Sequence, residues 1–150
     1  MRKRDFALSL AAALTAAVLI SSCASQNVPD SNMTVRCTEN LTGVDVINGG
    51  VAGTGLCAIT GLLHDGGPTT DYRTQKGETV FIRRVVTGAK GTITFMITIH
   101  LVGAPAEPWT IASGTKTYAK LHGQGYQVVD NYSGSPATFV LKGKASQVSA

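Results

Sequence analysis

The most regular feature of this chain is an alternation of apolar and polar side chains over residues 92–101. Because successive side chains of a β-strand point to opposite faces, this period of two predicts a strand with one buried and one wetter face. The residues expected on the buried face are Ile93, Phe95, Ile97, Ile99 and Leu101. Trp109, Phe139 and Leu141 stand in shorter apolar patterns and are expected in the same core.

Shorter strand patterns continue along the chain from residue 33. They cover residues 33–37, 56–63, 79–87, 109–113, 125–132 and 138–142. Turns or connections rich in glycine or proline are expected between them, at 49–55, 64–68, 88–91, 103–108, 114–121 and 134–136. About eight short strands predict an all-β domain, folded as an antiparallel β-barrel or as a sandwich, and closure into a barrel would remove exposed strand edges.

The first 22 residues have a different pattern, which is typical of an export signal. A basic start at residues 1–4 precedes an apolar run at 6–20, about 15 residues long and too short for a stable membrane-spanning helix. The run ends in Ile20-Ser21-Ser22-Cys23, which resembles the lipobox of bacterial lipoproteins. This resemblance implies cleavage before Cys23 and its modification with lipid, including palmitate. An ordinary secretory signal with an incidental cysteine is the alternative.

The same pattern predicts how the chain is divided and where it resides. Residues 1–22 are expected to form the signal helix, 23–32 a flexible polar tether, and 33–150 the β-barrel domain. The protein is then anchored by lipid in the cell envelope, on the extracytoplasmic side of a bacterial membrane. The membrane is its predicted partner, and the oligomeric state and the type of envelope stay open.

The cysteines agree with export. With Cys23 assigned to lipid, Cys37 and Cys57 remain, and an even number of cysteines in an oxidising compartment predicts one disulfide. A metal site is the alternative, but the chain has no Cys-x-x-Cys motif and no paired histidines beside them.

Charge gives little support to a nucleic-acid partner. The whole chain carries a formal net charge of +4, and removal of residues 1–22 leaves +2, because three basic residues and one acid go with them. No basic stripe with interleaved aromatic residues remains, so binding to nucleic acid is not expected.

The motifs of common enzymes and cofactor sites are also missing. The sequence contains no Walker A loop, no zinc-protease helix motif and no nucleophile elbow. Residues 53–58 match a dinucleotide-binding loop superficially, but a strand pattern follows where that loop requires a helix. We therefore predict no cofactor, no metal and no catalytic residue, and favour a protein that is not an enzyme.

Two neighbouring arginines are the most informative charged residues of the predicted barrel. Arg83 and Arg84 stand in one strand, so their side chains point to opposite faces. One of them must point toward the core, where it needs an acceptor or water. This inward arginine is expected to orient a ligand.

Residues 109–125, WTIASGTKTYAKLHGQG, resemble the late hairpin of allene oxide cyclase and dirigent-type barrels. The resemblance covers roughly residues 77–144 and implies an eight-stranded antiparallel barrel whose lumen takes small apolar molecules. In this pattern Tyr118 and Leu121 would plug one barrel end. Arg84, Tyr126 and Asp130 are chemically similar to the groups of dirigent-type sites, although no motif aligns them.

Three functions follow from these observations. The first is an anchored barrel that binds a small apolar ligand or a partner without catalysis, with Arg84, Trp109 and Tyr126 as candidate ligand contacts. The second is an isomerase or cyclase like allene oxide cyclase, favoured by a deep lumen that holds an arginine, a carboxylate and a tyrosine. The third is a structural or surface interaction module of the envelope, favoured by a broad apolar patch outside the barrel.

Overall fold

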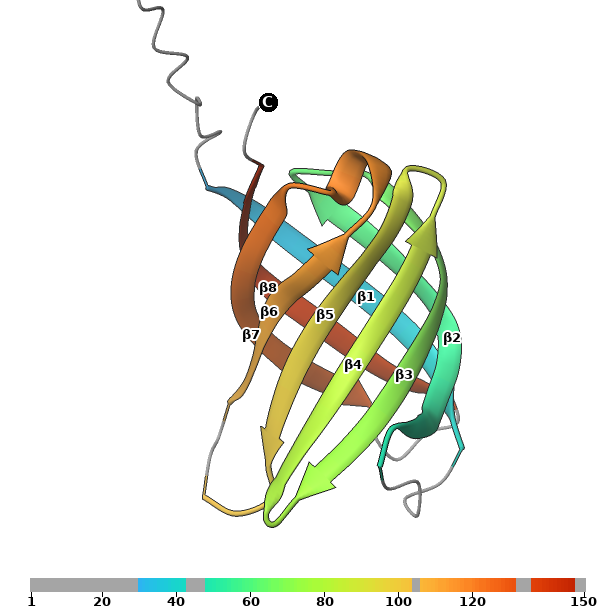
Figure 1. The fold of residues 1–150 in the computed structure, drawn as a ribbon, viewed down its shortest axis with the longest axis vertical. Helices are drawn as coiled ribbons and strands as arrows, with labels where there is room; N and C mark the ends of the chain where they lie inside the picture. The colour runs from blue at the N-terminus through green and yellow to red at the C-terminus, as the bar shows by residue number, and fades with distance from the viewer. Residues whose placement is uncertain (1–29, 43–47, 104–105, 132–135, 148–150) are drawn as a thin grey trace, which may run out of the picture.

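The computed structural model describes residues 30–42, 48–103, 106–131 and 136–147, which are almost entirely β-strand (Figure 1). The strands are β1 (Ser31–Leu41), β2 (Gly50–Gly61), β3 (Asp65–Lys76), β4 (Thr79–Gly88), β5 (Gly91–His100), β6 (Glu107–Gly114), β7 (Leu121–Asn131) and β8 (Ala137–Gln147). A short 3-10 helix, η1 (Lys116–Tyr118), connects β6 to β7. The predicted signal peptide and Cys23 lie outside the described residues. Among the described residues, no helix has the length and hydropathy to cross a bilayer.

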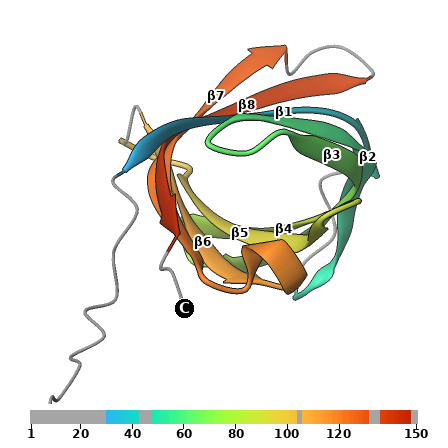
Figure 2. The ribbon, with the colours of Figure 1, turned by 90° about the horizontal axis from the view of Figure 1, so that it is seen from above.

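The eight strands close into an antiparallel barrel in which every strand pairs with its neighbours in the sequence (Figure 2). β1 completes the ring by pairing with β2 on one side and with β8 on the other. The prediction of an all-β fold of about eight antiparallel strands is confirmed, and the barrel rather than the sandwich is the architecture observed.

The observed strands are longer than their sequence patterns, and two of the predicted turns are wrong. Residues 50–55 belong to β2, where Gly55 permits a close approach to β1, since a Cβ there would lie 2.0 Å from the carbonyl oxygen of Thr38. Residues 65–68 open β3, a strand that the sequence pattern missed. The missing signal has a physical cause: the inward positions Thr69 and Asp71 are polar, so β3 has no apolar alternation.

The predicted core is confirmed for all but the last residue of the strong strand. Ile93, Phe95 and Ile97 are fully buried, and Ile99 packs partly buried against the same core. Trp109, Phe139 and Leu141 are buried as well. The prediction for Leu101 is wrong: β5 ends at His100, and Leu101 is 53% exposed in the bend that follows.

The two ends of the barrel differ. At the capped end, where β1 starts and β8 stops, η1 lies across the rim (Figure 1). Tyr118 and Leu121 are buried there as part of the hydrophobic core. The Tyr118 hydroxyl donates to Asp65 at 2.5 Å, and Asp65 also accepts backbone N–H groups of Ala89 and Lys90. The opposite end, where the β3–β4 turn lies, is called the open end.

Candidate functional site

The open end leads into a pocket inside the barrel, with a volume of about 530 Å³. Its apolar walls include Val80, Ile82, Ile99, Val129 and Phe139, and its polar lining consists of Asp71, Arg73, Arg84, Glu107 and Gln127. Leu41 and Leu101 line its mouth and are 41% and 53% exposed, so the pocket reaches the surface at this end. A concave site with apolar walls and a few convergent polar groups has the character of a small-molecule site.

Strand alternation brings Arg84, and not Arg83, into the barrel. Arg84 is 1% exposed and stands opposite Asp71 of β3 and Phe95 of β5. Arg83 points away from the lumen, and its guanidinium carbon lies 4.1 Å from the ring centroid of Tyr72. The inward arginine that the sequence predicted is therefore Arg84.

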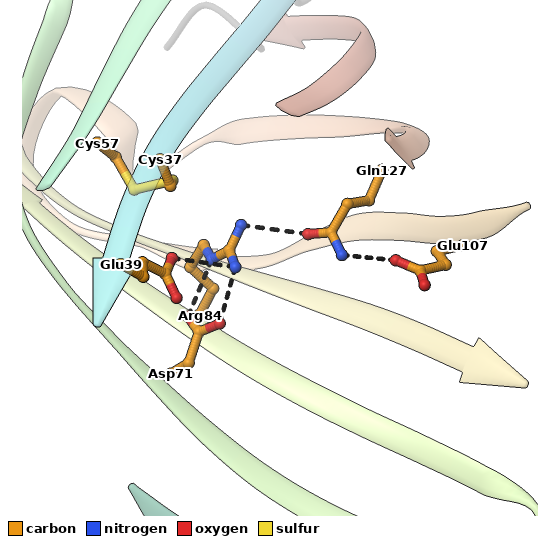
Figure 3. Close-up of polar contacts among 7 residues, drawn as sticks. All are labelled: Cys37, Glu39, Cys57, Asp71, Arg84, Glu107 and Gln127. Carbon is orange, nitrogen blue, oxygen red and sulfur yellow. Dashed lines mark hydrogen bonds and ion pairs between the residues drawn. A yellow bond between two sulfur atoms is a disulfide. The ribbon is translucent and has the colours of Figure 1, made fainter. Parts of the chain in front are cut away.

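The guanidinium of Arg84 is bound by side chains from three other strands (Figure 3). Its Nε and Nη2 donate to the two carboxylate oxygens of Asp71 at 2.9 and 2.7 Å. Its Nη1 donates to Oε1 of Gln127 at 3.2 Å, and Nη2 also lies 3.0 Å from Oε1 of Glu39. Burial alone would lower the pKa of Arg84, but the charge and hydrogen bonds of Asp71, with Glu39 and Glu107, raise it above its usual value. The arginine therefore stays charged.

Glu39 is the least satisfied member of this cluster. Its side chain is fully buried, and neither oxygen accepts a well-formed hydrogen bond from the described residues, despite the nearby Nη2 of Arg84. Gly53 leaves room for the carboxyl group, since a Cβ there would lie 3.1 Å from Oε2 of Glu39. Burial raises the pKa of Glu39 to about 8, although Arg84 acts to lower it. Burial therefore favours the neutral form of this acid.

Gln127 joins Arg84 to a further carboxylate nearer the pocket surface. Its Oε1 accepts from Arg84, and its Nε2 donates to Oε2 of Glu107 at 2.6 Å (Figure 3). These bonds fix the orientation of the amide and leave Glu107 at the edge of the buried cluster, where its side chain is partly exposed. The result is a polar chain that runs across the floor of the pocket from Glu39 to Glu107.

The predicted disulfide between Cys37 and Cys57 is confirmed. The two residues are directly opposed on β1 and β2, with Cα atoms 4.0 Å apart. Both sulfurs and a carboxylate oxygen of Glu39 lie within 4.8 Å of one another. This grouping is not a metal site, because a sulfur already bonded in a disulfide is not a thiolate ligand.

Trp109 and Tyr126, the other two predicted ligand contacts, do not line the lumen pocket. Trp109 is 1% exposed, packs edge to face against Phe95 and donates its indole N–H to the carbonyl oxygen of Lys142, so it is a core residue. Tyr126 is 59% exposed and borders a separate hollow of about 690 Å³ over β6, β7 and β8. The structure thus does not bring these two side chains together with Arg84 around a common site.

Comparison with protein-family models, curated proteins and solved structures finds no match to this chain. The resemblance to allene oxide cyclase and dirigent-type barrels therefore stays a prediction, and the barrel architecture rests on the structure itself.

Four members of the cluster were not predicted from the sequence: Glu39, Asp71, Glu107 and Gln127. A signal for Glu39 was present, because it stands two residues after Cys37 and so shares the inward face of β1. Asp71 had no signal, because β3 was not predicted as a strand. Glu107 and Gln127 had none, since their proximity to Arg84 depends on closure of the barrel.

Proposed function

We propose that this protein binds a small apolar molecule in its lumen pocket, as a lipid-anchored barrel on the extracytoplasmic side of a bacterial membrane, without catalysis. The observation that carries the proposal is the contrast between the two barrel ends. Side chains fill the capped end, whereas a pocket of about 530 Å³ with aliphatic and aromatic walls remains at the open end. Side chains alone can fill a barrel of eight strands, so an unfilled half favours a binding role.

The buried cluster supports this role by holding the pocket in shape. Arg84 connects β4 to β1, β3 and β7 through Glu39, Asp71 and Gln127. A network in which the guanidinium is held on several sides resists collapse of the floor into the space above it. The walls above this floor are hydrophobic, so release of water from them favours entry of an apolar molecule.

The test is binding of N-phenyl-1-naphthylamine, an uncharged apolar dye that fluoresces more strongly outside water. The lumen variant is Ile99→Trp, which places a bulky ring in the pocket wall. The control is Val128→Trp, a similar enlargement at a 48% exposed position of β7 outside the pocket lining. We expect saturable binding, weakened about tenfold or more by Ile99→Trp and changed less than about twofold by Val128→Trp. No saturable binding, or equal effects of the two variants, would overturn the proposal.

An isomerase or cyclase is the second candidate function. It is favoured by the presence of Arg84, Asp71 and Glu107 in an otherwise apolar pocket. It is ranked second because none of the described residues that line the pocket is a tyrosine, and because each nitrogen of the Arg84 guanidinium already donates to a protein side chain. Mass spectrometry of a bound apolar ligand after long incubation distinguishes the two: an unchanged ligand supports binding, and a rearranged one supports catalysis. The role of a surface interaction module stays a prediction.

A further inference from the structure

Each nitrogen of the Arg84 guanidinium already donates to a protein side chain. Nε and Nη2, which form one edge of the guanidinium, donate to Asp71, and Nη1 donates to Gln127. The guanidinium carbon lies 5.0 Å from the ring centroid of Phe139, so an aromatic ring packs against this cation as well. An anionic group of a ligand that displaced Asp71 or Gln127 from Arg84 would leave a buried carboxylate or amide without its partner.

The hydrogen-bond acceptors at the pocket floor, in contrast, are not all in use. Glu107 accepts one hydrogen bond, from the neutral amide of Gln127 to Oε2. Within the described part of the chain, no cationic side chain forms an ion pair with Glu107, and its Oε1 accepts no hydrogen bond. Glu107 lines the pocket and is partly exposed, so this oxygen is accessible to a ligand without displacement of any protein contact.

The charge of Glu107 points to the same sign of ligand. Asp71 neutralises Arg84, and burial favours the neutral form of Glu39, so neither of these two residues cancels the charge of Glu107. Arg73 is a second cation of the pocket lining; its Nη2 donates to Gln75 at 2.9 Å, and among the described residues no ion pair joins it to Glu107. A cation held in an apolar pocket needs a charged partner in hydrogen-bond contact, and Glu107 supplies one.

We infer that the lumen ligand is a cationic amphiphile, with an apolar body against the pocket walls and a protonated amine at Glu107. This inference rests on the proposed function, because it assigns the chemical class of the molecule that the pocket binds. It reverses the expectation that Arg84 orients the ligand: Arg84 organises the floor, and Glu107 contacts the head group.

The test compares three competitors of one chain length, decylamine, decanol and decanoate, each displacing N-phenyl-1-naphthylamine at pH 7 below the concentration at which it forms micelles. We expect half-displacement by decylamine at a concentration about tenfold or more below that of decanoate, with decanol between them. Because the net charge is positive, +4 for the whole chain and +2 without residues 1–22, non-specific attraction would favour decanoate, so a preference for the amine cannot come from overall charge.

A matched pair of variants assigns the preference to its residue. Glu107→Gln keeps a hydrogen-bond acceptor for Gln127 and removes the charge. We expect the ratio of the half-displacement concentration of decanoate to that of decylamine to fall to about threefold or less. Glu78→Gln removes an equal charge from an exposed position beside the β3–β4 turn at the same end, and should leave the ratio unchanged.

Each failure has a distinct meaning. Dye binding with decanoate equal to or better than decylamine would overturn this inference and leave the proposed function standing, as would a ratio insensitive to Glu107→Gln. Absence of saturable dye binding would overturn the proposed function and this inference with it. The wild-type comparison alone can contradict the inference, so the test does not depend on the folding of any variant.

Discussion

Arg84 and Asp71 face each other across β4 and β3 and form a bidentate ion pair inside the barrel, with N–O distances of 2.9 and 2.7 Å. The two side chains are only 1% and 6% exposed. The pair is therefore cut off from the water that would otherwise solvate each charge, and neither partner can be lost without leaving the other charge uncompensated.

The first prediction concerns removal of one partner of this pair. Asp71→Asn should lower the free energy of unfolding by about 3–5 kcal/mol, because it leaves the Arg84 charge buried without its main partner. The control is Asp130→Asn, which breaks the exposed ion pair between Arg36 and Asp130, whose side chains are 58% and 49% exposed. That loss should be about 1 kcal/mol or less. Urea unfolding measures the loss of stability in both variants. Similar losses would contradict the larger contribution expected from the buried pair.

The second prediction concerns the disulfide between Cys37 and Cys57, which closes a loop with a sequence separation of 20. The double variant Cys37→Ala with Cys57→Ala should be less stable by about 3 kcal/mol, because the unfolded chain gains conformational entropy. Unfolding of the wild type with and without a reducing agent provides an independent comparison. A double variant as stable as the oxidised protein would contradict a stabilising role for the bond.

The fold was predictable from sequence where the inner and outer faces differ in polarity. The alternation around Ile93 and Phe95 marked β5 because one face is apolar throughout. β3 was missed because its inward residues Thr69 and Asp71 serve the polar cluster, and a strand without apolar alternation has no period of two to detect. The polar residues of the candidate site therefore removed the apolar alternation by which β3 could have been predicted.

The candidate site itself was predictable only in its centre. Arg84 could be found because two adjacent arginines in one strand must point to opposite faces. Its partners Asp71 and Gln127 are 13 and 43 residues away in the sequence, and their contacts follow from strand register and from closure of the barrel. Local patterns carry no information about which inward side chains meet across a lumen, so the sequence indicates Trp109 and Tyr126 and gives no sign of Glu107 and Gln127.

The third prediction concerns Cys23, which lies outside the described residues. The lipobox-like ending of the apolar run predicts that the mature protein begins with an acylated Cys23 and partitions into the membrane fraction. Mass spectrometry of the purified protein tests this directly. Cys23→Ser should abolish the lipid and the membrane association together. Cleavage at another site with Cys23 unmodified would contradict the prediction.

The fourth prediction concerns the contact between Tyr118 and Asp65 at the capped end. The hydrogen bond from Tyr118, with backbone donors of Lys90 and Gly66, lowers the pKa of Asp65 from 3.8 to about 2. Tyr118→Phe should raise this pKa toward 3.8, though not fully, because the backbone donors remain. A carboxylate with a depressed pKa stabilises the fold above its unfolded pKa and loses that effect as pH falls through the folded value.

Carboxyl NMR titration of Asp65 measures the shift in the Tyr118→Phe variant. The ring of Tyr118 is retained in the variant, so packing of the capped end is largely preserved. An Asp65 pKa that stays at about 2 in Tyr118→Phe would show that the backbone donors alone account for the lowering.

The fifth prediction concerns the pH dependence that Glu39 imposes on stability. Burial raises the pKa of Glu39 from 4.5 to about 8, so in this range the folded protein keeps a proton that the unfolded chain has lost. Since stability falls with rising pH wherever the folded state binds more protons, the contribution of Glu39 should decline between pH 4.5 and about 8 and then level off. Protonation of Glu39 is thus a condition for full stability of the pocket floor.

The variant Glu39→Gln keeps the size of the side chain and cannot ionise, so this decline should disappear while other groups titrate as before. Urea unfolding of both proteins at pH 5 and pH 9 measures it: the variant should gain stability relative to wild type as pH rises. Glu78→Gln, at an exposed position, serves as the control and should follow the wild-type curve. If Glu39→Gln and wild type lose stability in parallel between these pH values, Glu39 is already ionised at pH 5, held by the nearby Arg84. The pocket floor would then carry an additional negative charge, which would strengthen its preference for a cationic ligand.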